Sequence, residues 1–414
     1  MKVLWLGDGG CHTGFGHVTH AIGERLVRDH GDEVHVLAIN HRGDAYPSLL
    51  DPLVQTPLRL YRPDSIVLGD MYGRSRIIEL LGDVEPDVVV MLNDPHVILD
   101  ILFKNRYDPK RTLLQHRPIL SYLPCDGYNL PPMWTELLPK VTRVVAMSQF
   151  GADSYGVKDV VHHGVDTVLY RPPSQSNPLT LSNGTVIQTK REAKKAFGFD
   201  PDGFLVTRVD KNSGRKDFAA TWKALVPVML RHPDIQVHFH CERDQPGHGI
   251  NLDTLITRET RIDPQRFFFP GLGNSFIGWP VQDLVGLLWA TDLRVSTSRG
   301  EGFGLNDAEA IACGVPVVAQ NVSATREVLS RGGYLIEPQR LITVPSGEDV
   351  WLADIEGFTD AIEYLYSSAG ARRDIGEAGR KHAVSSFNWD TAASRFHGYL
   401  EDLASSTREP MEAP

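Results

Sequence analysis

The chain has 414 residues, more than a single hydrophobic core usually serves, so we expect two domains. Hydrophobic residues make up 42% and charged residues 23% of the chain, which excludes a disordered or fibrous protein. The formal net charge of -10 argues against a general binder of nucleic-acid backbones, which needs clustered Lys and Arg, although a local basic groove stays possible.

The four cysteines lie far apart in the sequence and form no CxxC pair, so the sequence predicts neither a zinc site nor a disulfide framework. The first apolar run, residues 3–7, is too short and too early for a signal peptide, and we interpret it as a strand. No stretch reaches the roughly 18 consecutive apolar residues that a membrane-spanning helix needs. We therefore expect a cytoplasmic protein, soluble or at most peripheral at a membrane.

Short apolar runs alternate with longer amphipathic segments from the first residues onward, which is the rhythm of parallel βαβ units. The predicted elements of the first half are a strand, a helix and four further strands, at residues 2–6, 16–29, 33–39, 87–92, 119–123 and 143–147. These strands are rich in Val, Ile and Leu, as buried parallel strands are. Residues 1–172 are therefore predicted to form a doubly wound, Rossmann-like domain.

The pattern lapses over residues 173–190, where Pro, Ser, Asn and Gln predominate, and we interpret this stretch as a linker that buries no core. A second βα series follows and predicts a second Rossmann-like domain over residues 191–386. Its predicted strands lie at residues 203–207, 235–240, 267–269, 293–297 and 315–319. A final amphipathic segment, residues 388–404, has apolar residues at helical spacing and is predicted to pack back onto the first domain.

The stretch Ser298 to Val318, SRGEGFGLNDAEAIACGVPVV, combines a strand end, a glycine-rich turn and a helix that closes at a glycine. Glycines let a backbone turn tightly and aim its N–H groups outward, and the positive end of the helix dipole lies at the same turn. Two carboxylates, Glu301 and Glu309, flank the turn, and carboxylates accept hydrogen bonds from sugar hydroxyls well. Together these parts predict a site for a phosphorylated sugar.

This stretch resembles the signature of family 4 of the retaining nucleotide-sugar glycosyltransferases. That signature consists of two glutamates separated by seven residues within the pattern EGFG[LF]xxxEAxAxGxPVV. The resemblance implies a GT-B architecture, two doubly wound Rossmann-like domains facing across a cleft. It also implies that Glu301 contacts the transferred sugar and Glu309 the ribose of the nucleotide. The amides of the turn would bind the sugar and diphosphate, and the residues of that turn are Gly302, Phe303, Gly304 and Leu305.

A second matching stretch, FLVTRVDKNSGRKDF, begins at Phe204. In the family, an Arg and a Lys about five residues apart clamp the donor diphosphate after the first strand of the second domain. Lys211 and Lys216 occupy those positions. The family usually has arginine at the position of Lys211, and lysine offers a point charge in place of the bidentate fork of a guanidinium. It therefore stays open whether Arg208 or Arg215 also takes part in binding the diphosphate.

The first predicted strand is followed by a loop with five glycines in ten residues, but the loop lacks the GxGxxG spacing of dinucleotide-binding proteins. Family members carry a comparable loop that faces the donor phosphate and the acceptor. We therefore predict that Gly14 and Gly16 lie close to the ligand. A plain strand–helix turn is the structural alternative.

Many family members end a first-domain strand in a histidine that contacts the sugar, and this histidine is absent here. Pro124 stands at its position, and Asp126 is the nearest polar group that could reach the transferred sugar. His162 and His163 match the last strand end before the linker, and we interpret both as structural. Asp126 therefore joins Glu301, Lys211 and Lys216 in the predicted catalytic set.

The resemblance predicts that the chain moves a hexosyl group from a nucleoside-diphosphate sugar to an acceptor hydroxyl with retention of configuration. No Asp-x-Asp stands at a predicted strand end, so we expect no metal and no other cofactor. Alternatives are a nucleotide-sugar epimerase or a glycan phosphorylase on the same fold, or a nucleotide-sugar-binding protein without catalysis. The acceptor stays open among glycans, lipids, natural products, proteins and modified nucleic-acid bases.

Overall fold

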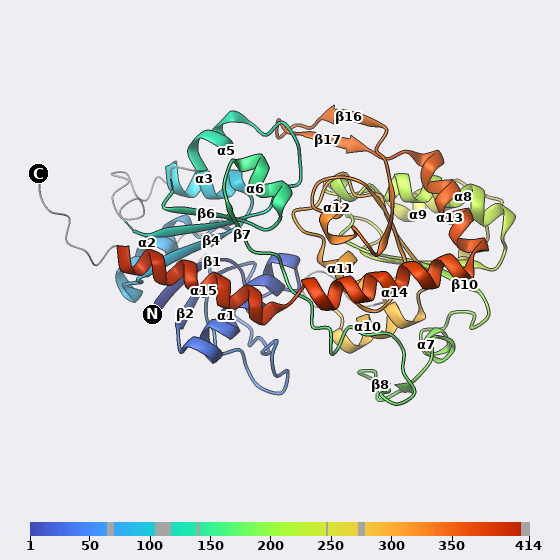
Figure 1. The fold of residues 1–414 in the computed structure, drawn as a ribbon, viewed down its shortest axis with the longest axis horizontal. Coiled ribbons are helices and arrows are strands. Elements are labelled where there is room, and N and C mark those ends of the chain that lie inside the picture. The colour runs from blue at the N-terminus through green and yellow to red at the C-terminus, as the bar shows by residue number, and fades with distance from the viewer. Residues whose placement is uncertain (64–69, 104–116, 139–140, 246, 272–277, 407–414) are drawn as a thin grey trace, which may run out of the picture.

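A computed structural model of the chain describes residues 1–63, 70–103, 117–138, 141–245, 247–271 and 278–406. It shows two α/β domains side by side, each built on a parallel sheet with helices on its faces (Figure 1). The predicted fold class, two doubly wound Rossmann-like domains, is thereby confirmed.

The first sheet has seven parallel strands in the order β3-β2-β1-β4-β5-β6-β7. Its central strands are buried from end to end, as expected of a sheet covered on both faces. The strands are β1 (Lys2–Asp8), β2 (Glu33–Ile39), β3 (Arg59–Tyr61), β4 (Val88–Leu92), β5 (Ile119–Leu123), β6 (Arg143–Ala146) and β7 (Asp159–Val160).

The helices of this domain are α1 (Gly14–His30), α2 (Arg74–Val84), α3 (Pro95–Phe103), α5 (Pro132–Leu137) and α6 (Gln149–Tyr155). Helix α1 begins at a side-chain cap, where the Thr13 hydroxyl accepts a hydrogen bond from the Gly16 amide. It ends at Gly31, whose φ of 67° is in the left-handed region that glycine adopts without strain.

The second sheet has six parallel strands in the order β12-β11-β10-β13-β14-β15. Its strands are β10 (Phe204–Val209), β11 (Ile235–His240), β12 (Phe267–Phe268), β13 (Leu293–Ser296), β14 (Val317–Gln320) and β15 (Gly333–Ile336). In both sheets the strand order reverses next to the first strand, between β1 and β4 and between β10 and β13. Ligands of open α/β sheets bind outside the carboxyl ends of the strands at such reversals.

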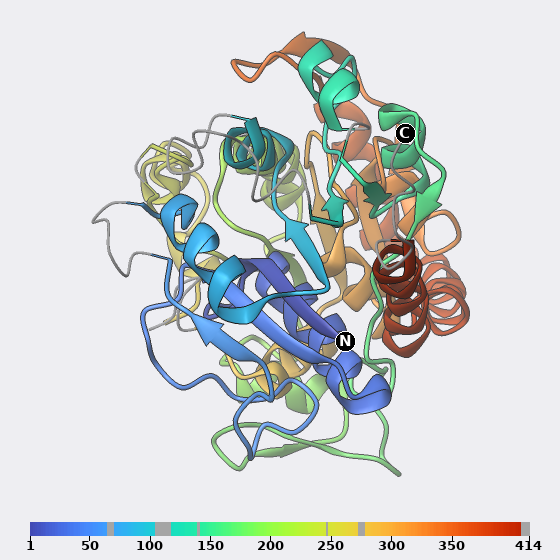
Figure 2. The same cartoon turned by 90° about the vertical axis from the view of Figure 1, so that its left-hand side faces the viewer.

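The helices of the second domain are α7 (Lys190–Ala196), α8 (Phe218–Arg231), α9 (Leu252–Thr257), α10 (Val281–Ala290), α11 (Leu305–Ala312), α12 (Thr325–Val328), α13 (Ile355–Ser367) and α14 (Ala369–Ser386). Short 3-10 turns lie at Gly214–Lys216 and Pro264–Arg266. A two-stranded antiparallel hairpin, β16 (Arg340–Thr343) and β17 (Asp349–Leu352), extends from this domain over the first (Figures 1 and 2). This hairpin was not predicted.

The last helix, α15 (Trp389–Ser406), continues the line of α14 and lies along α1 of the first domain (Figure 1). Its Phe396 is fully buried, with ring centroids 5.4 Å from both Trp5 and Tyr122 of the first sheet. The chain therefore crosses between the domains twice. None of the described helices is both long and apolar enough to cross a membrane.

The predicted linker contains more structure than its composition indicated. Strands β8 (Leu179–Thr180) and β9 (Val186–Ile187) pair antiparallel there, and Leu179, Leu181 and Ile187 are buried. The prediction that this stretch buries no core is therefore wrong, because three well-spaced apolar residues suffice to dock a hairpin onto the second domain beside α10. The domain boundaries at residues 172 and 191 stay predictions.

Candidate active site

An alternating row of charges runs from the second domain into the first at the carboxyl end of the sheets. Lys216, on the 3-10 turn after β10, places its Nζ 2.7 Å from Oδ1 of Asp210 and 2.6 Å from Oε1 of Glu301. Arg215 lies 3.1 Å from Oε2 of Glu301 and 3.1 Å from Oδ2 of Asp126, which follows β5 of the first domain. Glu301, Lys216, Arg215 and Asp126, predicted from separate stretches, are thus brought together.

Burial and pairing set the charge of each carboxyl group in this row. Burial raises the pKa of Asp126 to about 6, and the neighbouring guanidinium of Arg215 only partly offsets this effect. Burial also opposes ionisation of Glu301, but Lys216 and Arg215 outweigh it and lower the pKa to about 2. Both cations, Arg215 and Lys216, are therefore paired with carboxylates in this arrangement.

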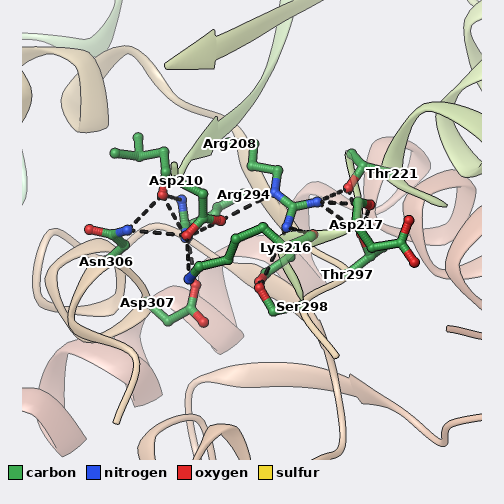
Figure 3. Close-up of polar contacts among 12 residues, drawn as sticks. Arg208, Asp210, Lys216, Asp217, Thr221, Arg294, Thr297, Ser298, Asn306 and Asp307 are labelled. Atoms are coloured by element: carbon green, nitrogen blue, oxygen red, sulfur yellow. Dashed lines mark hydrogen bonds and ion pairs between the residues drawn. The ribbon is translucent and has the colours of Figure 1, made fainter. Parts of the chain in front are cut away.

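Arg208, one of the candidate donor contacts, lies among Asp210, Thr221 and Thr297 within the second domain (Figure 3). Its side chain is 1% exposed, and its guanidinium donates to Asp210 at 3.2 Å, to Thr297 at 2.8 Å and to Thr221. It therefore supports the site from within the domain and does not face a ligand. Of the two arginines that the sequence left open, only Arg215 reaches the interdomain row.

Two further residues, the buried Arg294 and the partly buried Asn306, complete this support and were missed in the sequence. Arg294 on β13 donates from Nε to Oδ1 of Asp307 at 2.6 Å (Figure 3). Asn306 donates from Nδ2 to the Val209 carbonyl at 2.8 Å and to Asp210 at 3.2 Å. An arginine inside an otherwise apolar strand, LRVS, is the signal that could have indicated a buried ion pair.

A pocket of about 600 Å³ lies beside this row, between the two domains. Of the predicted residues, Gly14, Lys211, Leu305 and Glu309 line it. Its wall also includes residues that sequence reasoning missed, and these are His12, His17, Tyr46, Tyr170, Asn212, His240, Gln245 and Trp279. Several of them follow predicted strands, a position where ligand contacts are common, but their residue types alone carry no specific chemistry.

Glu309 lies in the second turn of α11 and is 7% exposed. Burial raises its pKa to about 7, while a hydrogen bond with Tyr170 acts in the opposite direction. The carboxyl group therefore titrates near neutral pH at the pocket wall. It differs in this respect from Glu301, which is held ionised by two cations.

The glycines of the SRGEGFG turn serve two purposes. Gly304 precedes α11 with a φ of 103°, which residues with side chains rarely adopt. A Cβ on Gly300 would lie 1.6 Å from the Asp126 carbonyl oxygen, and one on Gly302 would lie 2.6 Å from Cβ of Pro124. Two of these glycines therefore let the first domain approach closely.

The remaining predicted positions differ in their surroundings. A Cβ on Gly14 would meet nothing within 4 Å, whereas one on Gly16 would lie 2.3 Å from the Cys11 carbonyl oxygen, so Gly16 is required by the local turn. The Phe303 side chain is buried against His163, so only its backbone can face a ligand. His163 is buried with both ring nitrogens lacking a hydrogen-bond partner, and burial lowers its pKa to about 3. It fits the structural role that the sequence predicted.

Comparison with known proteins relates this chain to glycosyltransferases. Residues 255–368 match the family model described as glycosyl transferases group 1. The chain is 28% identical over 265 residues to a D-inositol 3-phosphate glycosyltransferase of Paenarthrobacter aurescens (strain TC1), covering 62% of this chain and 55% of that protein. It is 31% identical over 206 residues to the lipopolysaccharide core biosynthesis mannosyltransferase LpsB of Rhizobium meliloti (strain 1021), covering 48% and 51%. The chain thus spans about half the length of the relatives it matches.

Solved structures extend the likeness to the whole chain at the level of the fold. Sucrose-phosphate synthase from Thermosynechococcus elongatus superposes with a TM-score of 0.72 at 15% identity, over 98% of this chain and all of that one. Anabaena Alr3699/HepE in complex with UDP and glucose superposes with a TM-score of 0.67 at 18% identity, over 97% and 99%.

Two parallel-sheet domains with a charged, pocket-bearing cleft between them define a protein of the GT-B class. The matched segment spans the end of β13, the glycine turn and α11, the elements that carry Glu301 and Glu309. Over this segment the chain is similar to the group 1 glycosyltransferases, in agreement with the resemblance to family 4.

Proposed function

We propose that this protein transfers a hexosyl group from a nucleoside-diphosphate sugar to an acceptor hydroxyl, with retention of configuration. The observation that carries the proposal is the adjacency of two distinct parts in one cleft. One is the pocket lined by Glu309, Lys211 and Leu305, and the other is the row of Lys216, Glu301, Arg215 and Asp126. The first suits a nucleoside, and the second suits a sugar diphosphate.

The bond between the anomeric carbon and the diphosphate oxygen breaks in this reaction, and a bond from the same carbon to the acceptor oxygen forms. The electron pair of the broken bond stays on the departing diphosphate. Lys216, with Lys211 and Arg215 nearby, stabilises that negative charge, which is where preorganised cations act most strongly. The acceptor proton passes to the departing phosphate oxygen on the same face of the sugar, so the chain needs no separate base.

The two glutamates have different roles in the proposal. Glu309, at the pocket wall, accepts hydrogen bonds from the ribose hydroxyls, while Glu301 holds the transferred sugar. Asp126 reaches the same sugar from the first domain, in place of the histidine that the family commonly uses. Cationic side chains and the α11 N-terminus neutralise the diphosphate, and we expect no divalent ion and no other cofactor to be required.

A panel of nucleotide sugars tests this function first through protection against thermal unfolding, because ligands stabilise the folded state by mass action. The donor that protects is then incubated with candidate acceptors after EDTA treatment, and NMR of the fresh product reports its anomeric configuration. We expect retention in the absence of metal. An inverted product, or activity restored only by magnesium, would contradict the mechanism, and an epimerised donor would favour the epimerase alternative.

A further inference from the structure

Ser323 has an unusual backbone for a residue with a side chain. It lies in the turn between β14 and α12, is 4% exposed, and has a φ of 41°, in the left-handed region. A non-glycine residue adopts this conformation only where its surroundings hold it, and such residues cluster at functional sites. The contacts of Ser323 therefore indicate which part of the site depends on this backbone conformation.

Ser323 and its neighbour hold the backbone of Glu301 from both sides. The Ser323 Oγ accepts a hydrogen bond from the Glu301 amide at 2.7 Å, and the Ala324 amide donates to the Glu301 carbonyl at 3.3 Å. The conformation of Ser323 thus fixes the position of the carboxylate that pairs with Lys216.

Ser323 is held in turn by a residue of the other domain. Its amide donates to the Tyr128 hydroxyl at 2.8 Å. Tyr128 follows Asp126 by two residues and stands outside the pocket and the charged row. A chain of hydrogen bonds therefore leads from the loop of one sugar-side carboxylate, Asp126, to the other, Glu301.

The hairpin β16–β17 fixes Tyr128 in this arrangement. The Tyr128 amide donates to the Asp349 carbonyl at 2.7 Å, and the Asp349 amide donates back at 2.8 Å, which makes a β-bridge between the domains. The Tyr128 ring packs edge-on against Phe150 at 4.8 Å. Figures 1 and 2 both show the hairpin reaching over the first domain.

We propose that Tyr128 is a positioning residue whose hydroxyl, through Ser323, sets Glu301 opposite Asp126 when the two domains are in contact. When the domains separate, Ser323 loses its hydrogen bond to the first domain, and the contacts of Glu301 with Ser323 and Ala324 are no longer fixed from that side. The sugar-side site is then complete only in the closed arrangement, whereas the nucleoside pocket keeps its own residues. This inference rests on the proposed function, because it assigns Glu301 and Asp126 to the sugar.

The test compares the affinity of the full-length protein for a nucleotide sugar with its affinity for the corresponding free nucleoside diphosphate, by calorimetry. Tyr128→Phe removes only the hydroxyl. We expect the affinity for the nucleotide sugar to fall roughly fivefold, and that for the diphosphate to change by less than about twofold, because one hydrogen bond to the sugar side is misplaced. The kcat/KM of transfer should fall about as much as the nucleotide-sugar affinity.

Two further variants separate positioning from general stability. Ser323→Ala should have the same effect as Tyr128→Phe, and the double variant should lose little more than either single one, since both act through one chain of contacts. Tyr364→Phe, on an exposed tyrosine of α13, is the matched control and should leave both affinities unchanged. A role in stability alone would lower the unfolding temperature and leave the two affinities in their original ratio.

The outcomes distinguish this inference from the proposed function. Tight binding of a nucleotide sugar without transfer would contradict the function, while the affinity ratio would still test Tyr128. Transfer by the wild type together with an unchanged ratio in Tyr128→Phe would overturn the inference alone. Additive losses in the double variant would also overturn it, because they would show that the two residues act independently.

Discussion

The carboxyl groups in the two halves of the candidate site have different electrostatic surroundings. In the pocket proposed for the nucleoside, burial raises the pKa of Glu309 to about 7, and the hydrogen bond with Tyr170 and the charge of Arg294 offset this only in part. In the sugar-side row Glu301 contacts Lys216 and Arg215, and these cations lower its pKa to about 2. The pocket has room for a ligand, whereas the cations of the row are paired with its own carboxylates, and binding of the proposed diphosphate requires an exchange of these partners.

This difference teaches that a motif of two glutamates, seven residues apart, need not place them in equivalent surroundings. Glu301 precedes the glycine turn and lies against the first domain, while Glu309 lies on the helix after the turn and faces the cavity. The predictions below test how far the two regions, and the buried charges beneath them, act separately.

The largest expected effect is on stability, at the buried support beneath the row. Arg208→Met should lower the free energy of unfolding by about 3 to 5 kcal/mol, because it leaves Asp210 with fewer compensating partners inside the protein. Urea unfolding measures the change. Arg243→Met is the control, since the Arg243–Asp253 pair is exposed and should contribute less than about 1 kcal/mol. Equal losses in the two variants would contradict the assignment of Arg208 to the interior.

The next largest effect is expected on kcat/KM, when Lys216, which contacts the carboxylates of Asp210 and Glu301, is replaced. Lys216→Ala should lower kcat/KM by roughly 10²-fold or more, the loss expected when one preorganised contact to the departing charge is removed. Steady-state kinetics measure it, with Lys223→Ala on the exposed face of α8 as the control. Near-normal activity of Lys216→Ala would transfer the clamp to Arg215.

A smaller effect separates the two glutamates directly. Glu309→Ala should weaken binding of the free nucleoside diphosphate by about 1 to 3 kcal/mol, as expected for hydrogen bonds to a charged group. Glu301→Ala should leave that binding intact and instead lower kcat/KM and blur the choice of donor sugar. Calorimetry of both variants decides between them. The reverse pattern would exchange the two roles.

The smallest effect is a pH dependence that only one of the two regions should show. Protonated Glu309 accepts ribose hydrogen bonds poorly, so affinity for the nucleoside diphosphate should rise by up to roughly tenfold between pH 6 and pH 8, as the group with a pKa of about 7 ionises. Titration calorimetry at several pH values measures the rise. Glu309→Gln should abolish it, and Glu301→Gln should not, because Glu301 is ionised throughout this range. A rise that persists in Glu309→Gln would assign the dependence to another group.

Several parts of the site were predictable because they depend on contiguous residues. The strands at 33–39, 119–123 and 235–240 coincide with the predicted ranges, since short apolar runs between turn residues define buried strands locally. The glycine turn and the helix after it could be predicted for the same reason. The interpretation of residues 173–190 as a stretch that buries no core was wrong, and β16–β17 was not predicted, because both hairpins dock onto surfaces that are distant in the sequence.

The sequence by itself determined the two-domain α/β architecture, the Glu301 and Glu309 motif, and a basic stretch after β10. Each of these features depends on residues that are close together in the sequence. Only the tertiary structure decided which cation faces which carboxylate. Arg208, Arg215 and Lys216 look alike in sequence, but Arg208 lies on β10 and is buried, whereas the 3-10 turn after the strand directs Arg215 and Lys216 toward Glu301. The link from Tyr128 through Ser323 to Glu301 joins residues 195 and 22 positions apart in the sequence, a distance over which only folding brings side chains together.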